Sequence, residues 1–462
     1  MKPIIPDFDN ASGSPLYIQL YNYLKKEITE GGISKGEKLP SLRTLARNLS
    51  ISITTVEMAY NQLLVEGYVK SKPQSGYYTT SINAESKSKP GFSSAPLDFD
   101  TYPFTKAKYK YDTGSFDFIK WKKCLAKVLN EHADLLLFES DPQGEKVLRH
   151  EISGYLYSSR GVKCTPDQVV IAAGTQQLTN HLARIMRKMN ISHVSTEDPG
   201  YMPLQNIFRD MGFTLTKIPV HSDGINIEKL PVNIPSAVYV SPSNQFPTGA
   251  VMPIGRRYRL LDWAMKNHSI ILEDDYDSEL RYFGKPVPAL QGLDRSDSVV
   301  YLGSFSSTLF PAIKISYMVL PPRLANKFYE KLSFYSCTVS NFEQYTLAKF
   351  IDMGYFEKHI NRMRLYYSRQ RKKVLECIEK SVINDKCEVI ENDSGLHFLI
   401  KLNTKLSDEE VIKALKRERI VMKAISEYYI DKIESKHIFI LNYANIDIEK
   451  LRECLKIING TI

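Results

Sequence analysis

The chain has 462 residues, of which 43% are hydrophobic and 24% are charged. This length exceeds one ordinary domain and suggests two or three, and the balance of residue types is that of a globular rather than a disordered protein. The net charge of +9 favours a polyanionic partner only mildly, and it argues against the strongly basic proteins of ribosomes and membrane surfaces.

The cysteines and the apolar runs bear on metals, compartment and membranes. Six cysteines are scattered along the chain, without a CxxC pair and without histidines at zinc spacing. Reduced thiols of this kind are typical of a cytosolic protein. No apolar run approaches the ~20 residues that a membrane helix needs, and the first residues lack the apolar core of a signal peptide. We therefore expect a soluble, cytoplasmic protein without a metal site and without a membrane partner.

The first predicted domain covers residues 12–80 and begins with three helices. Apolar side chains at helical spacing predict a helix over about residues 16–30, which two glycines end. A second helix follows Ser41 as its predicted N-cap. After a short turn at residues 50–52, a third helix is predicted with Thr54 as its N-cap.

A β-hairpin is predicted over residues 68–79, with a basic residue near its tip. Two short helices joined by a tight turn are typical of a helix-turn-helix domain, whose second helix lies in the major groove of DNA. The hairpin adds a wing to this arrangement. We therefore expect a winged helix-turn-helix domain that is mainly α-helical with a β wing.

The rest of the chain is predicted to hold a linker and a second, larger domain. Residues 81–108 are rich in Ser, Lys, Pro and Ala and show little apolar periodicity, which is typical of a linker. Over residues 109–462, amphipathic helices alternate with short β-branched runs such as QVVIAAG, AVYVSPS, SIILEDD and SVVYLGS. This alternation predicts an α/β domain with a mainly parallel sheet. From about residue 365, mixed helix and strand patterns predict a smaller α+β lobe.

Several segments of the first domain resemble the winged helix-turn-helix of the GntR family. They are PLYIQLYNYLKKEI, LPSLRTLA, TTVEMAYNQLLVEGYV and SGYY. The resemblance implies binding to operator DNA through phosphate and base contacts. Ile53 stands where the family often carries an arginine, so one possible contact is lost. The residues implied to contact DNA are Arg43, Arg47, Thr54, Thr55, Glu57, Lys70 and Lys72.

The second domain resembles the fold-type I aminotransferases, which use pyridoxal phosphate (PLP). The segments that carry the resemblance are DPQGEKVLRHEISGYLYSSRGVKCTPDQVVIAAGTQQ, EDPGY, SPSNQFPTG and EDDYDSELRY. The resemblance implies an α/β PLP-dependent transferase-like fold with a small C-terminal α+β lobe. The residues implied to contact the cofactor are Gly174, Thr175, Gln176, Tyr201, Asn244, Asp274, Tyr276, Ser304, Ser307 and Lys314.

The resemblance also assigns roles to these residues. The first three lie where a strand end and a helix N-terminus hold the cofactor phosphate. Tyr201 stands where a ring stacks on the pyridine, and Asn244 or Gln245 stands where the 3-hydroxyl is bound. Asp274 and Tyr276 occupy the positions that meet the ring nitrogen and the 3-hydroxyl. A carboxylate at the ring nitrogen keeps it protonated and makes the ring an electron sink.

One segment departs from the family at its reactive position. The family pattern SFSKTLFPALRLGY corresponds here to SFSSTLFPAIKISY, so Ser307 replaces the lysine that forms the Schiff base. A hydroxyl cannot form that link, and no catalytic residue is predicted. Lys314 replaces the arginine that clamps the phosphate, which keeps the charge but loses the bidentate fork. Ile440 stands where aminotransferases often bind the substrate carboxylate. Ser307 is compatible with natural divergence and with an engineered replacement.

The order of the two domains resembles that of the MocR-type regulators. This resemblance implies a head-to-tail homodimer and a small-molecule effector, which would be an amine, an amino acid or PLP itself. A working PLP-dependent aminotransferase with an accessory DNA-binding module is the alternative, and Ser307 weighs against it. A regulator that has replaced PLP with another metabolite is a third possibility, and the retained Asp274 weighs against that one. The sequence predicts neither the effector, the operator nor the sign of regulation.

Overall fold

The computed structural model describes residues 4–9, 13–80, 116–281, 287–390, 395–418, 420–431, 433–444 and 446–462. The chain divides into two compact units, Met1–Phe104 and Thr105–Ile462. The predicted linker at residues 81–108 lies outside the described residues. Among the described helices, none combines the length and the apolar character that crossing a lipid bilayer requires.

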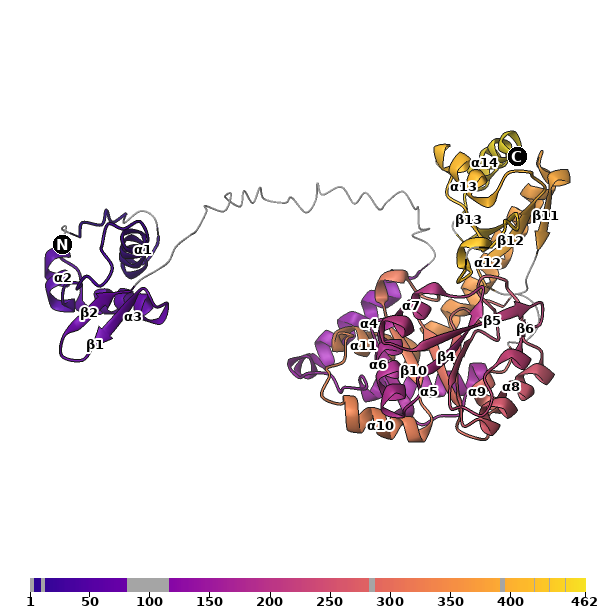
Figure 1. Ribbon diagram of the computed structural model, residues 1–462, viewed down its shortest axis with the longest axis horizontal. Helices are drawn as coiled ribbons and strands as arrows, with labels where there is room; N and C mark the ends of the chain where they lie inside the picture. The colour runs from indigo at the N-terminus through magenta and orange to yellow at the C-terminus, as the bar shows by residue number, and fades with distance from the viewer. Residues whose placement is uncertain are drawn as a thin grey trace. The chain divides into compact units, whose positions relative to one another are not determined.

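The N-terminal unit has the predicted helices and wing (Figure 1). The apolar faces of the three helices meet in one core, in which Leu20, Leu24, Val56, Tyr60 and Leu63 are completely buried. The wing strands pair in antiparallel fashion. The elements are α1 (Leu16–Thr29), α2 (Leu42–Leu49), α3 (Ile53–Val65), β1 (Val69–Lys72) and β2 (Gly76–Thr79).

Of the two predicted N-caps of the helix-turn-helix, one is confirmed and one is wrong. The Ser41 side chain accepts a hydrogen bond from the backbone N–H of Thr44 at 3.2 Å, so its predicted capping of α2 is confirmed. The prediction that Thr54 caps α3 is wrong. Ser52 is the cap and accepts from the N–H of Thr55 at 3.0 Å. The left-handed conformation of Ser50 (φ 54°) turns the chain sharply after α2, so that the next helix begins two residues earlier than predicted.

The C-terminal unit is built on one large mixed sheet (Figure 1). The strand order is β3-β10-β9-β8-β7-β4-β5-β6, in which neighbours from β9 to β5 are parallel and β10 runs antiparallel to β3 and β9. The predicted mainly parallel sheet is therefore confirmed. The strands are β3 (Val169–Ala172), β4 (His193–Asp198), β5 (Thr214–His221), β6 (Gly224–Ile225), β7 (Ala237–Val240), β8 (Ile270–Asp275), β9 (Val299–Ser304) and β10 (Ser316–Val319).

Helices cover both faces of this sheet, because alternate strand residues point to opposite sides. Val170 packs with helices α6, α7 and α10, whereas Ile171 packs on the other face with α5 and α11. The bounds are α4 (Phe118–Glu131), η2 (Ala133–Leu137), α5 (Lys146–Arg160), η3 (Pro166–Gln168), α6 (Thr175–Lys188), α7 (Met202–Asp210), η4 (Ile227–Lys229), α8 (Ile254–Lys266), α9 (Leu290–Leu293), η5 (Pro311–Ile313), α10 (Pro322–Leu332) and α11 (Asn341–Asp352).

A smaller α+β lobe follows, as predicted. Its antiparallel sheet has the order β11-β12-β14-β13, and a separate apolar core of residues such as Phe398, Val411, Phe439 and Leu455 joins the sheet to its helices. The long helix α12 leads from the large sheet into this small lobe (Figure 1). The elements are α12 (Tyr355–Glu379), η6 (Asn384–Lys386), β11 (Cys387–Ile390), β12 (His397–Leu402), α13 (Asp408–Arg417), β13 (Lys423–Ala424), η7 (Ile425–Tyr428), β14 (Ile438–Asn442) and α14 (Ile448–Thr461).

Candidate functional site

A cavity of about 270 Å³ lies at the carboxyl ends of the central strands of the large sheet. This edge is where open α/β sheets bind ligands. Its wall is made mainly of aromatic rings and hydroxyl groups, with a single carboxyl group and no cation among the described lining residues. The lining residues are Thr175, Tyr201, Tyr239, Ser241, Phe246, Asp274, Tyr276, Ser304, Ser306 and Ser307.

Asp274 supplies the carboxyl group of this wall. It lies near the end of β8, is 7% exposed, and accepts a hydrogen bond from the hydroxyl of Tyr239 on the neighbouring strand β7. Burial raises the pKa of Asp274 to about 7, whereas the hydrogen bond from Tyr239 acts to lower it. Sequence reasoning missed Tyr239, because all four residues of β7 are buried and no alternation marks the one that faces a ligand.

Tyr276 lines the cavity, and Asn244 contacts it from outside the wall. The Asn244 side-chain amide donates to the Tyr276 hydroxyl at 3.2 Å and to the Asp277 carboxyl at 2.9 Å. The Asn244 Oδ1 atom is buried without a hydrogen-bond partner among the described residues. Gln245, the other residue considered from the sequence, donates to the carbonyl of Pro199 at 2.9 Å and so braces the loop. Asn244 is therefore the residue of this pair that faces the Tyr276 hydroxyl.

The segment after β3 brings a helix N-terminus to the cavity. Gly174 is the N-cap of α6 and has a φ of 94°, a conformation that glycine adopts without strain. Thr175, the first residue of α6, lines the cavity. Gln176 forms a side-chain hydrogen bond with Tyr201, whose pKa burial raises and this bond lowers. The free N–H groups at such an end are suited to an anion.

The segment from Ser304 to Lys314 lines the cavity at its start but not at its end. Ser304 and Ser307 line the wall. The Ser307 hydroxyl donates to the backbone carbonyl of Tyr276 at 2.5 Å, and the Ser304 hydroxyl accepts from the hydroxyl of Ser316 at 2.9 Å. Lys314 follows η5 with an exposed side chain and is not part of the wall.

The small lobe contacts segments that border the site. The N–H of Gly200 donates to the carbonyl of Tyr428 at 3.1 Å, and the ring of Tyr428 lies 5.0 Å from that of Phe246. At Gly395 (φ 82°), a Cβ atom would lie 2.5 Å from Asn244 Nδ2 and 2.7 Å from Asp277 Oδ2. Only glycine permits this approach of the lobe to the Asn244 amide.

The residues present fit PLP held without a covalent bond. Asp274 suits the ring nitrogen, the Asn244–Tyr276 pair suits the ring hydroxyl, and the N-terminus of α6 suits the phosphate. The orphaned Oδ1 atom of Asn244 also leaves a buried polar group that a ligand donor could satisfy. Ser307 offers no amine for a covalent bond.

The DNA-contact residues implied by the sequence lie on the surface of the N-terminal unit. Arg43 and Arg47 are exposed one turn apart on α2. Thr54 and Glu57 are exposed in the first turns of α3, whereas Thr55 is partly buried and its hydroxyl lies 2.8 Å from that of Ser52. On the wing, Lys70 and Lys72 are both exposed, and the Lys72 ammonium lies over the ring of Tyr78.

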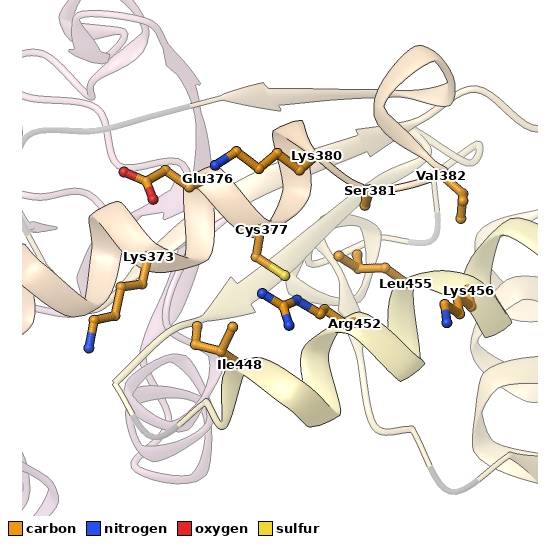
Figure 2. Close-up of a pocket in the computed structure, with 10 residues that line it drawn as sticks. All are labelled: Lys373, Glu376, Cys377, Lys380, Ser381, Val382, Ile448, Arg452, Leu455 and Lys456. Carbon is orange, nitrogen blue, oxygen red and sulfur yellow. The ribbon is translucent and has the colours of Figure 1, made fainter.

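Another cavity, of about 310 Å³, lies between α12 and α14 in the small lobe. Its basic side chains do not converge on one point. Figure 2 shows Lys373 extending away from Cys377 and Lys380 running toward Glu376, whereas Cys377 points into the space between the helices. Arg452 is already paired with Glu449 at 2.8 Å. Among the described residues, no group of three His, Cys, Asp or Glu side chains is placed to bind a metal ion.

Comparisons with known proteins match both units. Residues 16–78 match the model of the bacterial regulatory proteins of the gntR family, and residues 102–458 match that of aminotransferase class I and II. The chain is 40% identical to the uncharacterized HTH-type transcriptional regulator YdeL of Bacillus subtilis. The match spans 457 residues and covers 98% of each chain. It is 33% identical to the probable rhizopine catabolism regulatory protein MocR of Rhizobium meliloti. This match spans 464 residues and covers 96% of this chain and 93% of MocR.

Solved structures resemble the aminotransferase-like fold. A multiple substrate aminotransferase from Thermococcus profundus superposes with a TM-score of 0.67 at 24% identity, over 76% of this chain and 88% of its own. A kynurenine aminotransferase from Pyrococcus horikoshii superposes with a TM-score of 0.65, also at 24% identity, over 75% and 87%. At this identity the likeness shows the fold alone.

Proposed function

Because this chain belongs to the MocR-type family of helix-turn-helix transcription regulators, we propose that its aminotransferase-like domain senses PLP, or an adduct of PLP with an amine, without a covalent link to the chain. One observation carries the proposal. The cavity retains Asp274, Tyr276 and Tyr201, the residue types that hold the cofactor ring, while Ser307 stands where the link would form.

Each side chain of the site has a binding role in this proposal. The Asp274 carboxylate holds the N–H of the ring, the hydroxyl of Tyr276 and the amide of Asn244 hold the ring hydroxyl, and Tyr201 covers the ring face. The α6 N-terminus binds the phosphate, and the exposed ammonium of Lys314 supplies countercharge from outside the wall. When bound, PLP supplies an electron-withdrawing ring and an aldehyde that reacts with amines. Ser307 neither replaces the amine nor carries a proton away from a substrate, so binding rather than turnover is the expected outcome.

The rest of the regulator follows the same family pattern. We assign operator DNA to the surface formed by Arg43, Arg47, Thr54, Thr55, Glu57, Lys70 and Lys72. We also infer a cytoplasmic head-to-tail homodimer. Exposed apolar side chains on α4 and η2 support a subunit interface: Ile119 is 84% exposed and Leu137 is 85% exposed. The effector in this proposal is an amine or an amino acid, or PLP itself.

Reduction with borohydride tests the absence of a covalent link. The purified full-length protein is mixed with PLP, titrated by absorbance, reduced, and measured by mass spectrometry. We expect saturable, reversible binding and no pyridoxyl group on the chain. A pyridoxyl group on Lys314, or on any other lysine, would contradict the assignment of Ser307. A complete lack of binding of PLP and of pyridoxamine phosphate would favour a different metabolite in the cavity.

A further inference from the structure

Tyr239 lies beside Asp274 in the cavity wall, and the proposed function assigns no role to it. Strands β7 and β8 are parallel neighbours, with Tyr239 opposite Leu272, so that Asp274 lies two residues further along β8. Tyr239 is 2% exposed, and its ring forms part of the cavity wall. Its hydroxyl donates to Oδ2 of Asp274. The two side chains therefore form one hydrogen-bonded pair that borders the ligand space.

This bond is the single hydrogen bond to the Asp274 carboxyl found among the described residues. Asp275 follows Asp274 in β8, and the Asp275 charge opposes ionisation of Asp274, as burial does. A donated hydrogen bond stabilises the carboxylate relative to the neutral acid. Tyr239 is therefore the neighbour that favours the charged form of Asp274.

A pyridine nitrogen that faces Asp274 shares one proton with it. If the carboxyl group is a weak acid, the proton stays on oxygen and the ring is neutral. If the carboxylate is stabilised, the proton moves to nitrogen and the pair becomes a charge-assisted hydrogen bond. In a site without a covalent link to the ligand, this bond contributes a larger share of the binding.

We propose that Tyr239 is a positioning residue that, through Asp274, holds the ring nitrogen of the bound ligand in its protonated form. The inference rests on the proposed function, because it requires a pyridine ligand in the cavity. It assigns to this site a preference for the pyridinium form of PLP or pyridoxamine phosphate over isosteric rings without a basic nitrogen.

A binding cycle with two probes isolates this effect. Pyridoxamine phosphate and its 1-deaza analogue, in which carbon replaces the ring nitrogen, are titrated calorimetrically into the full-length protein and into Tyr239→Phe. We expect the unchanged protein to prefer pyridoxamine phosphate by at least about tenfold, the range of a hydrogen bond to a charged group. In Tyr239→Phe this preference should fall by about tenfold, while the affinity for the deaza analogue stays the same.

Tyr301→Phe is the matched control. Tyr301 lies on β9, donates to Asp275 at 2.6 Å, and is 1% exposed, but it is not part of the cavity wall. Its replacement removes a buried tyrosine hydroxyl from a buried aspartate without touching Asp274. We expect the preference between the two probes to be unchanged in this variant. A similar loss in both variants would overturn the assignment, because it would indicate general loosening of the buried acidic cluster.

A spectroscopic readout distinguishes positioning from simple packing. With ¹⁵N in the ring of pyridoxamine phosphate, the nitrogen shift reports protonation, and its midpoint pH should be lower in Tyr239→Phe. Asp274→Asn provides a second route if Tyr239→Phe folds poorly, since it should abolish the preference between probes. If pyridoxamine phosphate binds and Tyr239→Phe alters neither preference nor midpoint, the inference is wrong while the proposed function stands. If neither probe binds to any of these proteins, the proposed function fails first.

Discussion

Replacing Glu197 with glutamine should change how the stability of the aminotransferase-like domain depends on pH. Glu197 lies on β4 and is 2% exposed, and its carboxyl accepts from the N–H of Ser241 and from the Gln245 amide, both at 3.3 Å. These long hydrogen bonds do not compensate for the hydration that the Glu197 carboxylate loses on burial. Burial therefore raises the pKa of Glu197 from its ordinary value of 4.5 to about 8.

The sign and the size of the effect follow from linkage. Between these two pKa values the folded chain keeps a proton on Glu197 that the unfolded chain releases, so stability falls as pH rises through this range. Below about pH 4.5 the effect vanishes, and above about pH 8 it is complete. From pH 5 to pH 8 the loss from this one group is about 3 kcal/mol. The Glu197→Gln variant cannot lose that proton, so its advantage over the unchanged protein should grow by the same amount.

Urea unfolding at a series of pH values measures this difference. The two tryptophans of the chain, Trp121 and Trp263, both lie in the C-terminal unit, so their fluorescence reports that unit alone. The control is Glu228→Gln, which removes an exposed carboxylate paired with Arg259 at 2.9 Å and should show no such trend. An equal pH slope for Glu197→Gln and the unchanged protein would show that Glu197 is ionised in the folded state and would refute the reasoning.

Other substitutions test the remaining assignments. Ser307→Lys should restore a reducible covalent bond to PLP, seen as one pyridoxyl group by mass spectrometry; recovery of the unmodified mass after reduction would mean that the cavity does not align the aldehyde with this position. Arg43→Ala should weaken DNA binding in a gel shift on the promoter region and lower the salt slope by about one, and equal binding across salt would remove Arg43 from the interface. Ser52→Ala should destabilise the N-terminal unit by about 1 kcal/mol in circular dichroism melts, whereas Thr54→Ala should leave the cap intact.

The helical part of the DNA-binding unit could be predicted because its information is local. Leu20 and Leu24 lie one turn apart on a surface helix, and such spacing is visible without any knowledge of the rest of the chain. The start of the third helix was not determined in this way. Ser52 and Thr54 are both good caps, and the choice depends on the left-handed turn at Ser50, which the sequence pattern does not reveal.

The candidate site could be predicted only in part. Resemblance pointed to Asp274 and Tyr276, and the structure places both in the wall of one cavity. It could not point to Tyr239, whose role depends on which strand lies beside β8. Lys314 was predicted from the sequence motif, but it does not line the cavity. Its position in the motif suggests a phosphate contact, but the direction of an exposed lysine depends on local backbone geometry and on the ligand, and neither is written in the sequence.

Gly395 limits how the ligand preference of this protein can evolve. An exposed residue of the small lobe such as Val421, which is 76% exposed, can be exchanged without consequence for the cavity. Gly395 is different, because any side chain there would displace the amide of Asn244, which holds the Tyr276 hydroxyl. A mutation in the coding sequence of one lobe would thus alter recognition in the other. Descendants of this protein can therefore change their effector through residues of the cavity wall. A substitution at Gly395, in contrast, would affect the packing of the small lobe and the recognition of the ring at the same time.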